Sequence, residues 1–158
     1  MSVIVRTAGL ADLAQLATLM VEFYAESDRV LPVDQARRAF AALLENADLG
    51  SAHLIEAHGE PAGYAVLTVS HSMEYGGLRG FVDDLFVRPS MRQRGLATAL
   101  LADLRREAGR RGVRALLVEA AADNEAAQRV YRRAGFGDLG HQVLQQALAR
   151  PLHAPKAP

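Results

Sequence analysis

The sequence predicts an α+β fold in which a mixed, mostly antiparallel sheet carries helices on both faces. Three observations predict it. Apolar residues recur at helical spacing in four segments, the period falls towards two in the segments between them, and short turns join several of these strand-like runs. A chain of 158 residues that is 50% hydrophobic and has no cysteine can bury one core without disulfides. We therefore expect a single domain over residues 1–150.

The N-terminal third begins with a strand and continues with two helices. Residues 3–7 alternate apolar and polar side chains, which is typical of a short strand. Asp12 then opens a segment with helical apolar spacing, and Pro32 interrupts it before a second helix over residues 34–45. Residues 46–51 are expected to form a loop.

Three antiparallel strands are predicted next. Residues 53–57 and 63–69 flank a Gly-Glu-Pro turn at 59–61, which is typical of a hairpin. A third strand over residues 80–87 ends before Pro89.

The last third alternates helix and strand. Residues 95–109 carry leucines on one face and arginines on the other, which makes them the clearest helix of the chain. Residues 114–120 form the near-continuous apolar run of a buried strand. A helix over 124–134 should end at a left-handed Gly135, with Phe136 folding back. Residues 142–148 are predicted as a final strand, followed by a tail over 151–158.

Composition excludes several classes of function. Equal numbers of basic and acidic residues, 18 of each, give no general attraction to nucleic acid or an anionic membrane. A membrane span needs about 18 consecutive apolar residues, and no apolar run in the sequence approaches this length. The first residues do not resemble a secretion signal, so we expect a cytoplasmic protein. The five histidines lack ligand spacing, so no metal site is predicted: His53, His58, His71, His141 and His153. The sequence contains neither a Walker nor a dinucleotide-binding glycine pattern, and its serines lie in no nucleophile elbow.

The turn over residues 88–98 joins a strand to a helix. The first amides of that helix lack partners and point at the loop, so they favour an anion, and Gly95 permits a positive φ or a close backbone approach. Arg92 and Arg94 add positive charge, and a diphosphate would fit there. An ordinary turn with solvated arginines is the alternative interpretation of this segment alone.

The segment from Asp123 to Phe136 carries a polar stripe. Asn124 and Tyr131 are seven residues apart, nearly two helical turns, so they share a face with Ala127 between them. In isolation, Asn124 would serve only as a helix cap and Tyr131 as a half-buried core residue.

Together the two stretches resemble the GNAT superfamily of N-acetyltransferases. Residues 92–97, Arg-Gln-Arg-Gly-Leu-Ala, are similar to its acetyl-CoA pyrophosphate signature, [Q/R]-x-x-G-x-[G/A]. The second stretch is similar to its N-x-x-A-x-x-x-Y-x-x-x-G-F segment, and the likeness extends over roughly residues 3–148. The resemblance implies the three-layer GNAT fold and acetyl-CoA as cosubstrate. It also implies that these residues bind acetyl-CoA: Leu85, Phe86, Val87, Arg92, Gln93, Arg94, Gly95, Leu96, Ala97, Thr98, Asn124 and Ala127.

Three acidic residues lie on the predicted strands near this site. Asp83 and Asp84 interrupt an apolar strand, and alternation sends them to opposite faces, while Glu119 lies on the next strand. A purely structural role is the alternative for each. An alkylamine is protonated at neutral pH and needs a base before it can attack a thioester. In the mechanism that we favour, Asp83 takes this proton directly or through water, Glu119 is the reserve base, and Tyr131 protonates the leaving thiolate without an acyl-enzyme.

In this family the first helix and its following loop form one wall of the acceptor site. The candidate substrate-binding residues are Glu22, Tyr24, Glu26 and Asp84. Such an acidic wall suits a cationic small-molecule amine, although acidic residues on a solvated helix end are common. The alternatives are a peptide or protein N-acetyltransferase, a non-catalytic acyl-CoA-binding regulatory domain, and an unrelated α+β binding protein. A homodimer is also conceivable through the apolar pairs at residues 143–144 and 147–148.

Overall fold

A mixed five-stranded sheet forms the centre of the molecule, and it confirms the predicted fold class. The computed structural model describes residues 2–155. The sheet order is β1-β3-β4-β5-β6, with all pairs antiparallel except β5 and β6. The strands are β1 (Val3–Thr7), β3 (Gly50–Ala57), β4 (Glu60–Ser72), β5 (Gly77–Val87) and β6 (Leu116–Val118).

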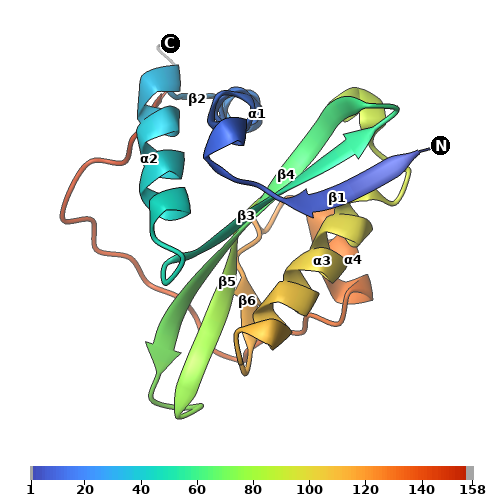
Figure 1. Cartoon of the computed structure of the whole chain (residues 1–158). Coiled ribbons are helices and arrows are strands. Elements are labelled where there is room, and N and C mark those ends of the chain that lie inside the picture. Colours follow the sequence, from blue (N-terminus) through green and yellow to red (C-terminus); the bar gives the residue numbers. More distant parts are fainter. Residues whose placement is uncertain (1, 156–158) are drawn as a thin grey trace.

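Two helices cover each face of this sheet (Figure 1). The helices α1 (Leu13–Ala25) and α2 (Val33–Glu45) bury one apolar layer with the sheet, and α3 (Leu96–Arg110) and α4 (Glu125–Arg133) pack on the other. Sequence patterns predicted these four helices to within a few residues. Among residues 2–155 no helix has the length and apolar character needed to cross a membrane.

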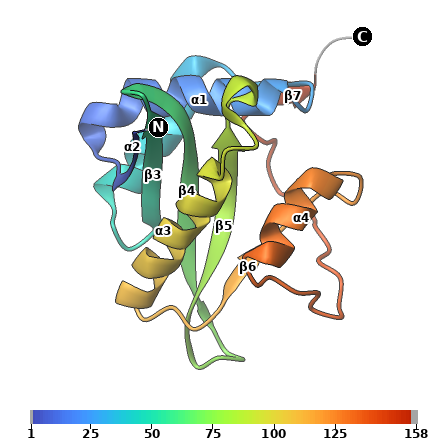
Figure 2. The ribbon, with the colours of Figure 1, turned by 90° about the vertical axis from the view of Figure 1, so that its right-hand side faces the viewer.

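The strands β5 and β6 pair over only part of their length. Gly80 to Val82 pair with Leu116 to Val118, whereas β5 continues to Val87. Figure 2 shows β6 and α4 diverging from β5 beyond this pairing. The edge of β5 after Val82 is therefore free of β6, and its backbone groups on that side can bind another molecule.

A β-bulge at Asp83 changes which face the following residues occupy. Val66 lies opposite Asp84 whereas Leu67 lies opposite Val82, so Asp83 is the extra residue. Val82 belongs to the core beneath α3, but Asp84 bonds Tyr64 in the core beneath α1 and α2. The bulge thus turns one acidic side chain into the α1 layer, which simple alternation along the strand does not predict.

The chain after α4 departs from the prediction. The strand expected over residues 142–148 is wrong, because this segment is exposed and irregular. Its apolar residues fall in the pairs 143–144 and 147–148, so they do not alternate as a strand requires. The predicted strand over 114–120 is shortened to β6 and is only half-buried.

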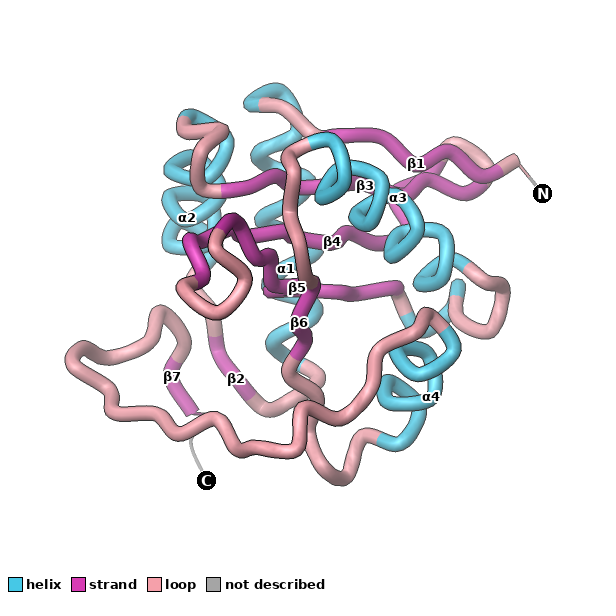
Figure 3. Tube along the Cα trace, turned by 90° about the horizontal axis from the view of Figure 1, so that it is seen from below, coloured by secondary structure: helices cyan, strands magenta, loops and turns pink. Residues whose placement is uncertain are grey.

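The predicted tail forms a small second sheet instead. Ala154–Pro155, β7, pairs with Arg29–Val30, β2, in an antiparallel arrangement. Figure 3 shows β7 beside β2, at the end of a long segment that returns from α4. Residues 156–158 of the predicted tail lie outside the described residues.

Candidate active site

A cavity of about 630 Å³ lies between the end of β5, the start of α3 and α4. Every residue that the sequence predicts to bind the cosubstrate lines this cavity, except Arg94. Tyr131 lines it as well, while Asp83 and Glu119 do not. Two motifs about 30 residues apart in the sequence therefore meet in one cavity.

The N-terminus of α3 opens into this cavity. Gly95 caps the helix in the left-handed region, with φ of 76°, and a Cβ added there would meet no atom within 4 Å. The amides of the following turn lack intrahelical partners, because the first four amides of any helix do. Open space beside unpaired amides at the positive end of a helix fits an anionic diphosphate, so the residues present suit acetyl-CoA.

Arg92 is held by α1 rather than left free in the cavity. Its Nη2 donates to both carboxylate oxygens of Glu26 at 2.6 and 2.7 Å, and its Nε donates to the carbonyl of Val87 at 2.8 Å. Arg94 is exposed on the same loop. Arg92 thus links the loop to α1, while Arg94 offers its charge to solvent.

Glu22 is likewise paired. Arg88 donates to its two carboxylate oxygens at 2.9 and 2.8 Å, and Arg88 also donates to the carbonyl of Pro61. The Glu22 carboxylate raises the pKa of Arg88. Both glutamates predicted for the acceptor wall therefore bind arginines of the β5–α3 connection.

Asp84 is buried in the α1 layer and does not line the cavity. The buried hydroxyl of Tyr64 donates to it at 2.8 Å. Burial raises the pKa of Asp84 to about 7, the Tyr64 hydrogen bond opposes this, and the nearby Asp83 adds to the rise. Asp84 consequently titrates near neutral pH, which an exposed aspartate does not.

Asp83 and Glu119 lie near enough, where β5 and β6 separate, for their charges to interact. Asp83 reaches solvent, yet partial burial and the neighbouring Glu119 carboxylate both raise its pKa. A carboxylate with a raised pKa is a stronger base than an ordinary aspartate. The structure thus brings together the two candidate bases.

Tyr131 lies half-buried on α4 with its ring edge against Phe136, 5.8 Å between ring centroids. Burial, and secondarily the charge of Asp84, raise its pKa above the usual value, so its phenol stays protonated at neutral pH. Within residues 2–155 its hydroxyl makes no hydrogen bond. Asn124 caps α4 by accepting from the amide of Ala127 at 3.1 Å, as the structural interpretation of the sequence proposed.

Sequence patterns did not identify Tyr64 or Arg88 as site residues. Tyr64 on β4 donates a hydrogen bond to Asp84 on the neighbouring strand β5. Arg88, in the loop after β5, donates to Glu22 on α1, which lies 66 residues earlier in the chain. No local spacing signals either contact. Among the described residues no group of three or more acidic, histidine or cysteine side chains could hold a metal ion.

Comparison with known proteins shows the family. The model described as the Acetyltransferase (GNAT) family matches residues 13–136. An aminoglycoside N(6')-acetyltransferase type 1 of Salmonella typhimurium is 29% identical over 106 residues, which cover 65% of this chain and 73% of that protein.

Solved structures share the whole architecture. An integron cassette protein from the mobile metagenome of Cole Harbour Salt Marsh is 51% identical, with a TM-score of 0.87, covering 94% of this chain and 92% of that one. The aminoglycoside acetyltransferase AAC(6')-Iy, bound to a CoA-acetylneamine bisubstrate analogue, is 22% identical with a TM-score of 0.81, covering 94% and 100%, and it shows the fold alone. The match of the family model over most of the chain confirms the resemblance seen in the two motifs. The chain therefore belongs to the acetyltransferase (GNAT) family, and it is an N-acetyltransferase.

Proposed function

We propose that this protein transfers the acetyl group of acetyl-CoA to a primary amine of a small cationic molecule, by direct attack and without an acyl-enzyme. The observation that carries the proposal is the cavity itself. It joins the anion-binding start of α3, the open edge of β5 and the Tyr131 side chain, with Asp83, Asp84 and Glu119 close by.

Binding of acetyl-CoA uses two features of the backbone. The diphosphate is bound by the amides of the first turn of α3, beside Gly95, with Arg94 supplying charge. The pantetheine arm lies along the edge of β5 from Leu85 to Val87, which β6 leaves unpaired. Arg92 joins the diphosphate site if its pair with Glu26 opens, and otherwise it holds the loop in place.

The acceptor amine must lose a proton before it attacks. An alkylammonium has a pKa of about 10.4, so at neutral pH almost none of it is free amine. Asp83 takes that proton, directly or through a water molecule, because burial and Glu119 raise its pKa. Glu119 is the alternative base, since it lies near enough to Asp83 for their charges to interact.

Acetyl transfer then needs an oxyanion site and an acid. Acetyl-CoA supplies the acetyl group as a thioester, and the backbone of Leu85 to Val87 donates to the thioester oxygen. A thiol has a pKa of about 8.5, so its thiolate gains from a proton donor as it leaves. Tyr131 is that donor, because its raised pKa keeps the phenol protonated and its hydroxyl is free of other partners in the part of the chain that the structure describes. As the C–N bond forms and the C–S bond breaks, the nitrogen releases its second proton, which returns through solvent to the Tyr131 phenolate.

The acceptor site is assigned to Tyr24 and Asp84. Asp84 provides a carboxylate near neutral pH, and Tyr24 lies close enough that both aspartates raise its pKa. The name of the Salmonella relative suggests an aminoglycoside, a molecule with several ammonium groups, as the acceptor class. Glu22 and Glu26 take part only if their pairs with Arg88 and Arg92 open.

A release assay for free CoA tests the proposal. The purified chain is incubated with acetyl-CoA and separately with neamine, spermidine and a lysine peptide, and the products are identified by mass. Acetylation of neamine or spermidine supports the proposal, whereas exclusive turnover of the peptide supports the protein-acetyltransferase alternative. Binding of acetyl-CoA with no turnover of any amine would support the non-catalytic alternative.

We also propose that the protein acts as a homodimer in the cytoplasm. Large apolar side chains are exposed on the segment after α4: Leu144 is 88% and Leu148 is 92% exposed. Exposed apolar residues this close together favour contact with a second copy. Light scattering should give the mass of a dimer, and the variant Leu144→Ser/Leu148→Ser should give that of a monomer.

A further inference from the structure

The segment after α4, residues 137–155, returns to the opposite end of the molecule, and we call it the C-terminal strap. It runs from α4 to the end of α1, where β7 pairs with β2 (Figures 2 and 3). The family model ends at residue 136, so the strap lies outside the residues that it matches. Sequence patterns assigned it a homodimer contact at residues 143–148 and no role in the acceptor site.

The end of the strap is fixed by backbone pairing and by one ring contact. Val30 lies opposite Ala154, and Arg29 lies opposite Pro155. The imidazole of His153 packs edge-on against the ring of Tyr24, with 5.7 Å between ring centroids and an interplanar angle of 68°. Its Nδ1 is buried without a hydrogen-bond partner in the described part of the chain, so packing holds the ring.

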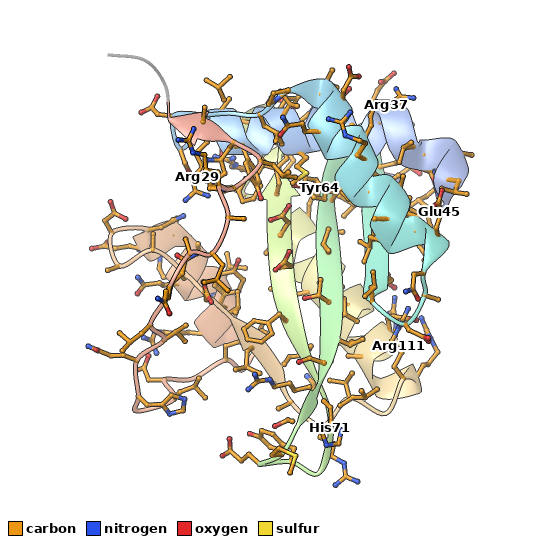
Figure 4. All side chains as sticks on the ribbon, turned by 90° about the vertical axis from the view of Figure 1, so that its left-hand side faces the viewer. Arg29, Arg37, Glu45, Tyr64, His71 and Arg111 are labelled. Atoms are coloured by element: carbon orange, nitrogen blue, oxygen red, sulfur yellow. The ribbon has the colours of Figure 1, made fainter. Side chains whose placement is uncertain are left out.

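The strap thereby contacts residues of the proposed acceptor site. The guanidinium of Arg29 lies over the Tyr24 ring, 5.8 Å from its centroid. Burial raises the pKa of Tyr24 to about 12, and Asp84 and Asp83 add to the rise. Arg29 in turn lowers the pKa of Asp84. Figure 4 shows Arg29 beside the strap at the end of the molecule where Tyr64 lies, whereas His71 lies at the opposite end.

We propose that the C-terminal strap is a wall of the acceptor site, in which His153 is a positioning residue that holds Tyr24 beside Asp84 and so sets the affinity for a cationic amine. The proposal rests on the proposed function, since it assigns an acceptor to this site. It adds a specificity element beyond the family-wide part of the chain. Contacts between ring edges and faces orient both partners. The Tyr24 ring also packs edge-on against Phe23, with 5.5 Å between ring centroids, and lies under Arg29, so loss of the His153 ring removes one of the three contacts that orient it.

A disulfide tests the placement of the strap without any substrate. Residues opposite each other in an antiparallel pair have Cα atoms about 4.5–5.5 Å apart, within the range that a disulfide spans. The native chain has no cysteine, so the variant Val30→Cys/Ala154→Cys contains only the two introduced thiols. We expect mild oxidation to close an intramolecular disulfide, seen as the loss of both free thiols in a product that keeps the mass of one chain under denaturing, non-reducing conditions. The control Val30→Cys/Gln146→Cys should form no disulfide within one chain, and equal intramolecular closure in the two variants would overturn the placement.

Binding measurements then test the role of His153. Neamine and spermidine are titrated by calorimetry into the protein saturated with CoA. Because CoA carries no acetyl group, the amines bind without being acetylated. We expect His153→Ala to weaken amine binding about threefold to tenfold, the size of effect that one ring contact supports. Binding of CoA should stay unchanged. His153→Phe keeps a ring against Tyr24 and should restore the affinity, while Gln146→Ala on the exposed strap should match the wild type.

The outcomes separate this inference from the proposed function. If His153→Ala binds both amines as the wild type does, or loses affinity for CoA equally, the inference is overturned while the acetyltransferase proposal stands. If the wild-type protein neither binds nor acetylates any amine, the proposed function fails and the acceptor role of the strap fails with it, even where the disulfide forms.

Discussion

The hydroxyl of Tyr64 donates a 2.8 Å hydrogen bond to Asp84, and both residues are buried. The contact exists because the bulge at Asp83 turns Asp84 into the layer under α1. It places a carboxyl with a pKa of about 7 in the layer under α1. We expect this residue to affect stability and, in the proposed function, acceptor binding, and the two effects can be measured apart.

Replacement of Asp84 should change how stability depends on pH. The folded-state pKa of Asp84, about 7, lies above the value of about 3.9 expected in the unfolded chain. Its contribution to the free energy of unfolding is therefore complete below about pH 4 and is lost as pH rises through 7. The Asp84→Asn variant has no carboxyl to ionise at this position. Between pH 5 and pH 8, the free energy of unfolding measured in urea should therefore rise for Asp84→Asn relative to the wild type. The exposed control Asp34→Asn should show the same dependence of unfolding free energy on pH as the wild type. If the curve for Asp84→Asn also runs parallel to that of the wild type, the assigned pKa of Asp84 is contradicted.

A buried hydrogen-bond network between β3 and α3 should contribute more to the free energy of unfolding than the exposed ion pairs beside it. His53 Nδ1 lies 2.6 Å from Asp103, and His53 Nε2 lies 2.8 Å from the hydroxyl of Ser51. Asp103→Ala leaves a buried imidazole without its partner and should cost about 1–3 kcal/mol. Glu107→Ala, one turn later on the same helix, removes more exposed pairs with Arg110 and Arg111 and should cost at most about 1 kcal/mol. Equal costs in denaturant melts would show that burial of the network has no special effect.

The same network makes the protein sensitive to acid. Burial lowers the pKa of His53 below the usual value, although the hydrogen bond between its Nδ1 and the Asp103 carboxylate opposes this shift. The folded state therefore favours the neutral form of His53. This preference contributes to the free energy of unfolding above the unfolded pKa of about 6.5, and the contribution is lost as pH falls below that value. Thermal melts of the wild type should show a falling Tm below about pH 6.5, and a smaller fall in His53→Gln. An identical fall in both proteins would assign the acid sensitivity to other groups.

Gly95→Val should remove acetyl-CoA binding without unfolding the protein. A side chain there meets no protein atom, so it extends into the space assigned to the diphosphate. The left-handed φ of 76° should cost about 1–2 kcal/mol for a residue with a Cβ. Gly112→Val has nearly the same φ, 74°, and equally open space at the far end of α3. Calorimetry should show lost binding only for Gly95→Val, and normal binding by it would place the diphosphate elsewhere.

Tyr131→Phe should lower turnover and leave stability and cosubstrate affinity nearly unchanged. The substitution keeps the ring contact with Phe136 and removes a hydroxyl that bonds no other described residue. Loss of a general acid typically lowers the rate by about 10²–10⁴-fold. Steady-state rates and denaturant melts on one preparation give both quantities. Near-normal turnover would remove Tyr131 from the mechanism.

Local patterns predicted the helices and the cavity because their signals lie within single segments. Gly95 shows this clearly, since a glycine between a strand and an amphipathic helix indicates a positive φ and an anion site, and both motifs line one cavity. The wrong strand over residues 142–148 shows the limit of this approach. These residues were expected to form a final strand, but pairing depends on which sheet edge the chain reaches, and the chain continues to β2 instead.

The contacts that shape the acceptor side are long-range and could not be predicted from spacing. The Asp84–Tyr64 bond depends on a bulge, which adds one residue to a strand and leaves no mark in the alternation of Asp83 and Asp84. The pairing of Glu22 with Arg88 joins elements far apart in the chain. Both contacts follow from the three-dimensional packing of α1 on the sheet.

Titration calorimetry of acetyl-CoA into the wild-type protein tests the central claim most directly. The account predicts saturable binding of one equivalent per chain, together with a rise in Tm that grows with ligand concentration, because a ligand of the folded state stabilises it. Dephospho-CoA and adenine nucleotides alone should bind more weakly, since they make only part of the contacts. A folded protein that shows neither binding heat nor a Tm shift at millimolar acetyl-CoA would contradict the assignment of the cavity, and with it the proposed reaction.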